Sequence, residues 1–333
     1  MYVVHSYTLA VILCVVTMFC WGSWANTKKL ADKSWRFELF YWDYSLGVLL
    51  LTLIAGLTLG STGGEGHTFG ADLLQAGSLP VRSALLGGAI FNIANILLVA
   101  AIEIAGMAVA FPVGVGLALI IGVITNYIAA PVDDGGLLAI GVLLVTLAIV
   151  LDAVAYRRLA AGASGVSTRG LVISVVCGIL MGSFYRLVAT AMYADPAFPE
   201  PGKMGPYAAV FVFAVGIFLS SFVWNTLAMK TRLLGAPVAF SDYFKGRWSD
   251  HLTGLLGGLI WGVGMTLNLI ASGRAGFAIS YGLGQGATMV AAFWGVFIWK
   301  EFRSAPRGTA GLITAMFACF LTGLAVIVMA RTH

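Results

Sequence analysis

The sequence predicts an all-α integral membrane protein with ten transmembrane helices in a five-plus-five inverted-topology repeat. Three observations lead to this prediction: an apolar composition, ten long apolar runs, and a repeated pattern of small residues. Hydrophobic residues make up 60% of the 333 residues and charged residues only 10%, whereas a soluble domain has about 25% charged residues. A chain of this length cannot bury so much apolar surface in one core, so lipid must solvate much of it.

The ten apolar runs have the length that a bilayer requires, which is about 20 residues of helix. They predict spans near residues 8–27, 40–60, 82–102, 105–129, 136–156, 170–194, 206–229, 251–271, 276–299 and 308–330. The segment 82–129 is almost continuously apolar, and Glu103 and Gly106 indicate a tight hairpin inside it. The first five residues contain no lysine or arginine, so we interpret the first run as a span and not as a cleavable signal peptide.

The lysines and arginines of the loops are divided unevenly between the two faces of the predicted bundle. The face with the N-terminus carries four of them: Arg82, Lys203, Arg274 and Arg331. The other face carries fourteen: Lys28, Lys29, Lys33, Arg36, Arg157, Arg158, Arg169, Lys230, Arg232, Lys245, Arg247, Lys300, Arg303 and Arg307. The positive-inside rule places the second face in the cytoplasm. We therefore expect a multi-pass protein of the cell (inner) membrane with both termini outside.

An internal repeat relates the two halves of the chain. Leu85-Leu86-Gly87-Gly88 recurs as Leu255-Leu256-Gly257-Gly258 at an offset of 170, and the same offset aligns residues 105–116 with 275–286. Residues 22–24 resemble 182–184, at an offset of 160. Because each copy holds five spans, the second is inverted relative to the first. We predict a first repeat at 1–156, a short cytoplasmic linker at 157–169 and a second repeat at 170–333. Secondary transporters commonly have this arrangement and bind solute between the halves.

A series of short motifs, taken in order along the chain, resembles the ureide permease family of the drug/metabolite transporter superfamily. The motifs are Met1-Tyr2-Val3-Val4, Trp21-Gly22-Ser23-Trp24, Asp43-Tyr44-Ser45-Leu46, Gly87-Gly88 with Asn92 and Asn95, Asn126-Tyr127, Asp133-Asp134, Gly246-Arg247-Trp248, Phe293-Trp294-Gly295-Val296 and Lys300-Glu301-Phe302-Arg303. The resemblance implies proton-coupled uptake of ureide or nucleobase-type heterocycles such as allantoin and uracil.

This chain departs from the plant members of that family between the fifth and sixth spans. The plant proteins have a long cytosolic loop there with a P-loop-like motif, whereas this loop runs only from about Tyr156 to Arg169. Residues 162–170 lack the G-K-[ST] sequence that cradles phosphate. We therefore expect a bacterial-type relative that neither binds nucleotide nor uses ATP.

Polar and aromatic residues inside the spans are the candidates for solute binding: Arg186, Asn92, Gln285, Trp24 and Tyr281. A charged side chain within a span is costly and usually functional, although Arg186 could instead extend to the outer interface. Amides both donate and accept hydrogen bonds, which suits a ureide or lactam; the alternative for them is interhelical bonding. A flat ring could stack on an aromatic side chain, and packing is the alternative for each of those.

Two carboxylates, Asp43 and Asp152, are the candidates for proton coupling, with Asp43 first because the family motif includes it. Both lie near cytoplasmic span ends, so a charged helix end or a gate that pairs with Lys28 or Lys29 is the alternative.

The four cysteines and four histidines match no metal spacing, so no metal site and no cofactor is expected. We expect a secondary transporter and not an enzyme, whose partners are a small-molecule substrate, protons and the lipid bilayer. The alternatives are a sugar permease and a drug or metabolite exporter. Scattered basic residues do not indicate nucleic-acid binding, and the sequence leaves monomer and homodimer both open.

Overall fold

The computed structural model describes residues 1–159, 167–196 and 198–331, and within these residues the named elements are all helical. Ten helical segments are long and apolar enough to cross a membrane. They are Tyr7–Leu30, Phe37–Leu57, Ser78–Ala105, Phe111–Ala129, Gly135–Leu159, Thr168–Ala191, Pro206–Lys230, Trp248–Ala275, Phe277–Ile298 and Thr309–Met329. The predicted all-α membrane fold and its ten spans are confirmed, with boundaries that differ from the expected ones by a few residues.

Several spans are built from more than one helical piece. The elements are α1 (Tyr7–Ser23), η1 (Trp24–Leu30), α2 (Phe37–Leu57), α3 (Phe69–Gln75), α4 (Ser78–Ala105), α5 (Met107–Ala110), η2 (Phe111–Val115), α6 (Gly116–Ala129), α7 (Gly135–Leu159), α8 (Thr168–Ala191), α9 (Pro206–Lys230), η3 (Phe240–Lys245), α10 (Trp248–Ala275), α11 (Phe277–Gly284), α12 (Ala287–Phe293), η4 (Trp294–Ile298) and α13 (Thr309–Met329). The breaks between α11 and α12 and between η1 and α1 lie beside the functional site described below.

The hairpin expected within residues 82–129 turns at Gly106, which ends α4. Its φ of 77° lies in the left-handed region, which a residue without a Cβ adopts freely. Gly276, its equivalent at the offset of 170, ends α10 with a φ of 85°. The two glycines therefore make the same turn at corresponding places in the two halves.

Glycines also let helices from opposite halves pack backbone against backbone. A Cβ added at Gly88 of α4 would lie 2.1 Å from the carbonyl oxygen of Phe213 on α9. A Cβ added at Gly258 of α10 would lie 2.1 Å from the carbonyl oxygen of Tyr44 on α2. In a bilayer, where water does not drive helices together, such close approach of small residues is a main source of association.

Two hydrogen bonds repeat this reciprocal pattern at the offsets found in the sequence. Thr17 on α1 donates to the carbonyl oxygen of Gly264 on α10 over 2.9 Å. Cys177 on α8 donates to the carbonyl oxygen of Ala94 on α4 over 3.3 Å. Thr17 corresponds to Cys177 at the offset of 160, and Ala94 corresponds to Gly264 at the offset of 170. The five-plus-five repeat remains a prediction, and these paired contacts support it.

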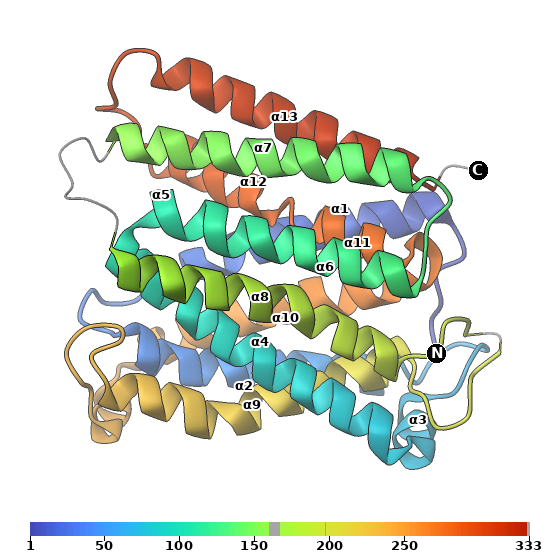
Figure 1. Cartoon of the computed structure of the whole chain (residues 1–333). Helices are drawn as coiled ribbons and strands as arrows, with labels where there is room; N and C mark the ends of the chain where they lie inside the picture. The colour runs from blue at the N-terminus through green and yellow to red at the C-terminus, as the bar shows by residue number, and fades with distance from the viewer. Residues whose placement is uncertain (160–166, 197, 332–333) are drawn as a thin grey trace.

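The bundle has two ends, which Figure 1 distinguishes. The N-terminus and the end of α13 lie together at one end, called the terminal end, and the end of α7 and the start of α8 lie at the other, called the linker end. α7 ends at Leu159 and α8 begins at Thr168. Most of the predicted linker, residues 160–166, lies outside the described residues. Termini at the same end agree with an even number of spans.

Candidate functional site

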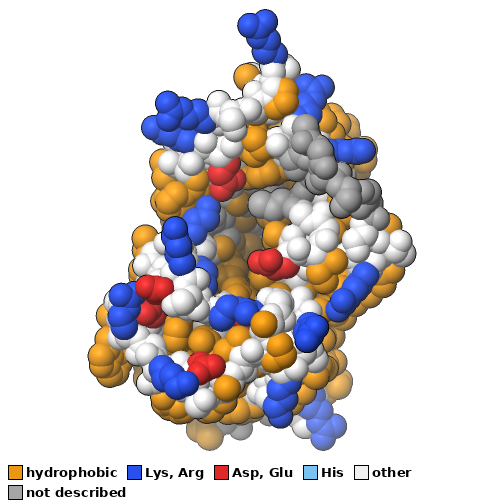
Figure 2. Space-filling view, turned by 90° about the vertical axis from the view of Figure 1, so that its left-hand side faces the viewer, with side chains coloured by type: hydrophobic (Ala, Val, Ile, Leu, Met, Phe, Trp, Pro, Cys, Tyr) orange, Lys and Arg blue, Asp and Glu red, His pale blue; other side chains and the backbone are white. Residues whose placement is uncertain are grey.

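A cavity of about 320 Å³ lies between the two halves of the bundle. Figure 2 shows the hollow from the linker end, with hydrophobic side chains inside it and lysines, arginines and carboxylates around its rim. The lining comprises Trp21, Gly22, Trp24, Ala25, Lys28, Phe37, Phe40, Phe91, Asn95, Leu98, Val99, Ile102, Phe111, Val115, Met181, Phe184, Trp261, Gly284, Gln285, Ala287, Thr288 and Ala291. A mostly apolar cavity of this size with a few polar groups is typical of small-molecule sites.

Aromatic side chains at repeat-related positions form much of the wall. Phe91 on α4 corresponds to Trp261 on α10 at the offset of 170, and their ring centroids lie 4.5 Å from each other. Trp24 on η1 corresponds to Phe184 on α8 at the offset of 160, and both line the cavity. Each half thus contributes one ring of each pair, which agrees with the predicted inverted repeat.

A second layer of rings supports this wall. The ring of Trp24 packs on Tyr44 of α2, with centroids 4.6 Å apart. Phe184 packs in the same way on Phe213 of α9, with centroids 5.7 Å apart. Tyr44 and Phe213 are fully buried. Because both layers are packed, the aromatic wall is formed before any solute enters.

Two amides and an ammonium group break the symmetry of the lining, and Thr288 adds a hydroxyl group. Asn95 donates from Nδ2 to the hydroxyl of Tyr41 over 3.2 Å. Gln285 lies at the break between α11 and α12, and Lys28 is the charged residue of this lining. At the stated offsets their partners in the other half are Met265, Val115 and Val188, which are apolar. The amides and the ammonium group therefore give the cavity its polarity and its direction.

A glycine next to Gln285 lets Trp21 pack closely against this segment. A Cβ added at Gly284 would lie 2.7 Å from the ring of Trp21. The helix therefore has no side chain at this point, which leaves room for the Trp21 ring. The next residue, Gln285, follows the end of α11, and it is part of the cavity lining.

The structure places Trp24 and Gln285, two of the five predicted solute contacts, in the lining. Asn92 is fully buried on α4 and donates to the Ile217 carbonyl, Ser220 and Ser221 over 3.0, 2.8 and 3.1 Å. It thus ties α4 to α9 outside the cavity. Tyr281 is also fully buried, and its hydroxyl donates to the carbonyls of Ala118 and Met181, each over 3.2 Å.

Arg186 is half-buried on α8, two residues after Phe184, and is not part of the lining. It lies in the part of α8 nearer the terminal end, as the sequence predicts. Its solute-binding role stays a prediction.

The two coupling candidates also lie outside the cavity and apart from each other. Asp43 on α2 accepts a hydrogen bond from the hydroxyl of Tyr243 over 2.6 Å, and its Oδ2 lies 2.9 Å from Nδ1 of His251. Asp152 is only 5% exposed on α7, which packs on α13. Their coupling role stays a prediction too, and the histidine partner of Asp43 was not expected.

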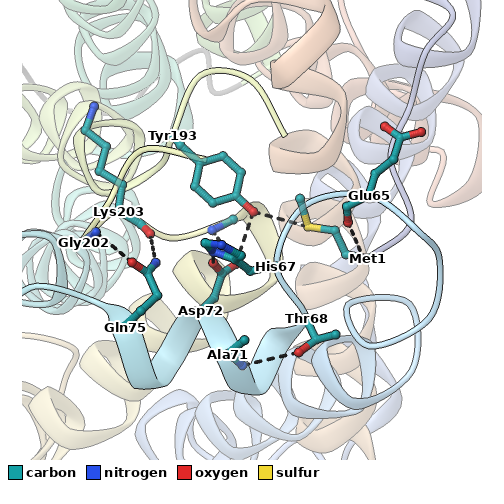
Figure 3. A network of polar contacts seen from close by, with 11 residues as sticks. Met1, Glu65, His67, Thr68, Ala71, Asp72, Gln75, Tyr193, Gly202 and Lys203 are labelled. Atoms are coloured by element: carbon teal, nitrogen blue, oxygen red, sulfur yellow. Dashed lines mark hydrogen bonds and ion pairs between the residues drawn. The ribbon is translucent and has the colours of Figure 1, made fainter. Parts of the chain in front are cut away.

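The terminal end is closed by a network around Asp72 of α3, which Figure 3 shows. Its carboxylate accepts from the backbone N–H of Gly205 over 2.7 Å and from the hydroxyl of Tyr193 over 3.4 Å. Nδ1 of His67 lies 3.2 Å from its other oxygen. The carboxylate thus ties the α2–α3 connection of the first half to the α8–α9 connection of the second.

Two further contacts strengthen this closure. Gln75 accepts from the backbone N–H of Gly202 over 2.7 Å and donates to the carbonyl of Lys203. The N-terminal amino group of Met1 donates to the carbonyl of Glu65 over 2.7 Å. Burial raises the pKa of Asp72, although its hydrogen bonds act in the opposite direction. The structure is therefore open at the linker end and closed at the terminal end.

Comparison with known proteins agrees with this architecture. The profile of a family described as ureide permease matches residues 162–331. Ureide permease 1 of Arabidopsis thaliana is 22% identical over 390 aligned positions that cover all of both chains, and ureide permease 2 of the same plant is 23% identical over 398. These alignments are longer than the 333 residues of this chain, so the plant proteins carry residues that it lacks.

Two further comparisons concern a shorter match and a solved structure. Transmembrane protein 144 homolog B of Dictyostelium discoideum is 23% identical over 168 residues, which cover 49% of this chain and 41% of that protein. A protein of known crystal structure superposes with a TM-score of 0.64 and 16% identity, covering 96% of each chain. At that identity the likeness shows the fold alone.

Proposed function

Because the chain belongs to the ureide permease family of membrane transporters, we propose that it carries a small neutral heterocycle of ureide or nucleobase type into the cell by proton-coupled secondary transport. Allantoin and uracil are the solutes to test first. The observation that carries this proposal is the cavity between the halves, with its aromatic wall and its two amides.

The chemistry of the lining matches the chemistry of such solutes. A ureide or a pyrimidinedione is flat and presents alternating N–H and C=O groups. The side chains of Asn95 and Gln285 offer both donors and acceptors, and the rings around them offer faces for stacking. No carboxylate is among the lining residues in the described part of the chain, which disfavours an organic cation as the solute.

The shape of the bundle supports transport by alternating access. The cavity opens at the linker end, and the terminal end is closed by the Asp72 network. With the basic loops in the cytoplasm, as the charge asymmetry predicts, this is an inward-open state. Rocking of one half against the other would then open the terminal end around a fixed site.

Uptake by cells tests the proposal. The chain is produced in a bacterial strain without its own allantoin and uracil uptake, and the cells are given radiolabelled allantoin, uracil, glucose and ribose in turn. We expect saturable uptake of a ureide or nucleobase and none of either sugar. Uptake of a sugar alone would identify a sugar permease, and efflux without uptake would identify an exporter; either result contradicts the proposal.

A further inference from the structure

A cluster of a carboxylate, an imidazole and a phenol lies on the linker side of the bundle, apart from the solute cavity. Asp43 of α2 is 5% exposed, and the side chain of His251 of α10 is 18% exposed. With Tyr243 of η3 they line a separate pocket of about 440 Å³. A carboxylate within an apolar span is costly, so its retention here requires an explanation beyond packing.

Together, three elements enclose the carboxylate of Asp43. The hydroxyl of Tyr243 donates to Oδ1 over 2.6 Å, and Nδ1 of His251 lies 2.9 Å from Oδ2. The rings of Trp35 and Tyr243 pack edge-on against the imidazole, with centroids 4.9 and 4.6 Å from it. Both carboxylate oxygens therefore have a partner, and the imidazole ring has a fixed orientation.

The other charged groups on the elements around this pair are engaged elsewhere. Arg36 pairs with Glu38 over 2.8 Å, Arg247 with Asp250 over 3.0 Å, Lys245 with Asp242 over 2.7 Å and Lys29 with Glu301 over 3.2 Å. Lys28 lines the solute cavity, and Lys230 is exposed at the end of α9. No lysine or arginine among the described residues pairs with Asp43, so His251 is the group whose protonation balances its charge.

The corresponding positions of the other half carry no ionisable group. At the offset of 170 the partner of His251 is Val81. Gly47 of α2 lies against Leu255 of α10, and Gly216 of α9 lies against Leu85 of α4. Because Leu85 and Leu255 correspond at the offset of 170, Gly47 corresponds to Gly216, at an offset of 169. At that offset the counterpart of Asp43 is Val212. The Asp43–His251 pair therefore has no counterpart at the corresponding positions of the other half, and the Asp72–His67 pair at the terminal end lies in the connections between spans.

We propose that Asp43 and His251 together form the proton-binding site of this transporter, separate from the solute cavity. This inference rests on the proposed transport function and names the groups that couple it to protons. Without a bound proton the pair has a net charge of −1, and with one it is neutral. Because both side chains line the adjacent pocket and a carboxylate and an imidazole can each bind a proton, the pair can exchange a proton with water that enters this pocket.

The cost of burying charge gives the direction of coupling. A net charge of −1 is tolerated while water fills the pocket and becomes costly when the linker end closes and the pocket is sealed. Closure of the linker end therefore favours the proton-bound pair, and opening of that end favours release of the proton into the cytoplasm. Uptake of solute and proton in the same direction follows.

Packing connects the pair to the solute cavity. Tyr44, next to Asp43, packs on Trp24 and Trp261 of the cavity wall, with centroids 4.6 and 6.4 Å away. A Cβ added at Gly254 of α10 would lie 2.6 Å from Cβ of Asp43. α2 and α10 are thus in direct contact at the pair, and a shift there reaches the aromatic wall.

Proteoliposomes that contain a pH-sensitive dye test the inference. Proton entry on addition of external solute is measured beside exchange of labelled for unlabelled solute, which needs no net proton movement. For Asp43→Asn and His251→Gln we expect solute-driven proton entry to fall about tenfold or more, while exchange remains. Asp133→Asn and His5→Gln, which replace exposed residues at the terminal end, are the matched controls and should behave like wild type.

The outcomes separate this inference from the proposed function. If wild type exchanges no ureide or nucleobase, the proposed function fails. If it exchanges solute and proton entry persists in both Asp43→Asn and His251→Gln, the proton site lies elsewhere and the inference is overturned; loss of coupling in Asp152→Asn alone would identify the other carboxylate. If Asp43→Asn does not accumulate in the membrane, the inference is tested with His251→Gln and Tyr243→Phe, which keep the carboxylate. An unchanged pH dependence of coupling in both variants would overturn the inference.

Discussion

Asn95 of α4 donates a hydrogen bond to the hydroxyl of Tyr41 on α2 over 3.2 Å. This bond joins a side chain of the cavity lining to the helix that carries Asp43. Asn92, three residues earlier on the same helix, instead bonds to α9 and lies outside the cavity. The two amides therefore form a matched pair, one placed to contact solute and one placed to hold helices together.

Replacing these two asparagines in turn should have different effects. Asn95→Ala should raise KM for solute about three- to tenfold, the effect of losing one hydrogen bond. Asn92→Ala should leave KM unchanged and lower the melting temperature, because α9 loses the partner of Ser220 and Ser221. Uptake kinetics and thermal unfolding of both variants are the measurements. A higher KM in Asn92→Ala alone would contradict this assignment of roles.

The proposed orientation predicts that both termini lie outside the cell. A phosphatase fused after Arg331 should be active, and one inserted in the 157–169 linker should be inactive. The fourteen basic loop residues at the linker side against four at the other are the physical reason. The reverse pattern of activities would invert the bundle in the membrane and place the open cavity on the outside.

Arg186 remains a predicted solute contact, and its position restricts when that contact could form. Since it lies toward the closed terminal end and outside the lining, we expect it to act in the outward-open state. Arg186→Ala should raise KM for uptake from outside with normal amounts of protein in the membrane. Arg186→Lys should do so as well, because it loses the planar fork of donors. Normal KM in both variants would favour extension of the side chain to the interface.

Asp72 should make the stability of the closed terminal end depend on pH. Burial raises its pKa, and the hydrogen bonds from Gly205, His67 and Tyr193 oppose this shift without cancelling it. Its contribution to stability is therefore fully present below the ordinary value of 3.8 and is lost as pH rises through the raised value. The melting temperature of wild type should rise relative to that of Asp72→Asn as pH falls from neutral to about 4. A rise in the melting temperature of wild type relative to Asp72→Asn on raising the pH would show that the hydrogen bonds affect the pKa of Asp72 more than burial does.

The fold was predictable because lipid imposes simple rules on sequence. The ten spans follow from apolar length, and the turn at Gly106 follows from a residue that tolerates positive φ. Part of the site was predictable as well, since Trp24 and Gln285 lie in aromatic and glycine-flanked segments. The 160 and 170 offsets also relate Phe184 to Trp24 and Phe91 to Trp261, and this signal could have predicted the paired rings.

Other parts of the site depend on tertiary contacts that no local pattern contains. Asn92 and Asn95 share roughly one face of a helix, yet one reaches the cavity and the other reaches α9, and only the packing of α4 decides which. His251 was one of four scattered histidines until α2 and α10 brought it to Asp43, 208 residues away. Separation along the chain concealed that pair.

The central claim is that solute binds in the cavity between the halves, and equilibrium binding to the purified protein tests it most directly. Labelled solute, chosen from the uptake panel, is titrated onto wild type, Trp24→Ala, Gln285→Ala and Trp224→Ala; Trp224 lies on α9 outside the lining. The account predicts affinities about three- to tenfold weaker for Trp24→Ala and Gln285→Ala, from lost stacking and a lost hydrogen bond, and wild-type affinity for Trp224→Ala. Wild-type affinity in all three variants would contradict it.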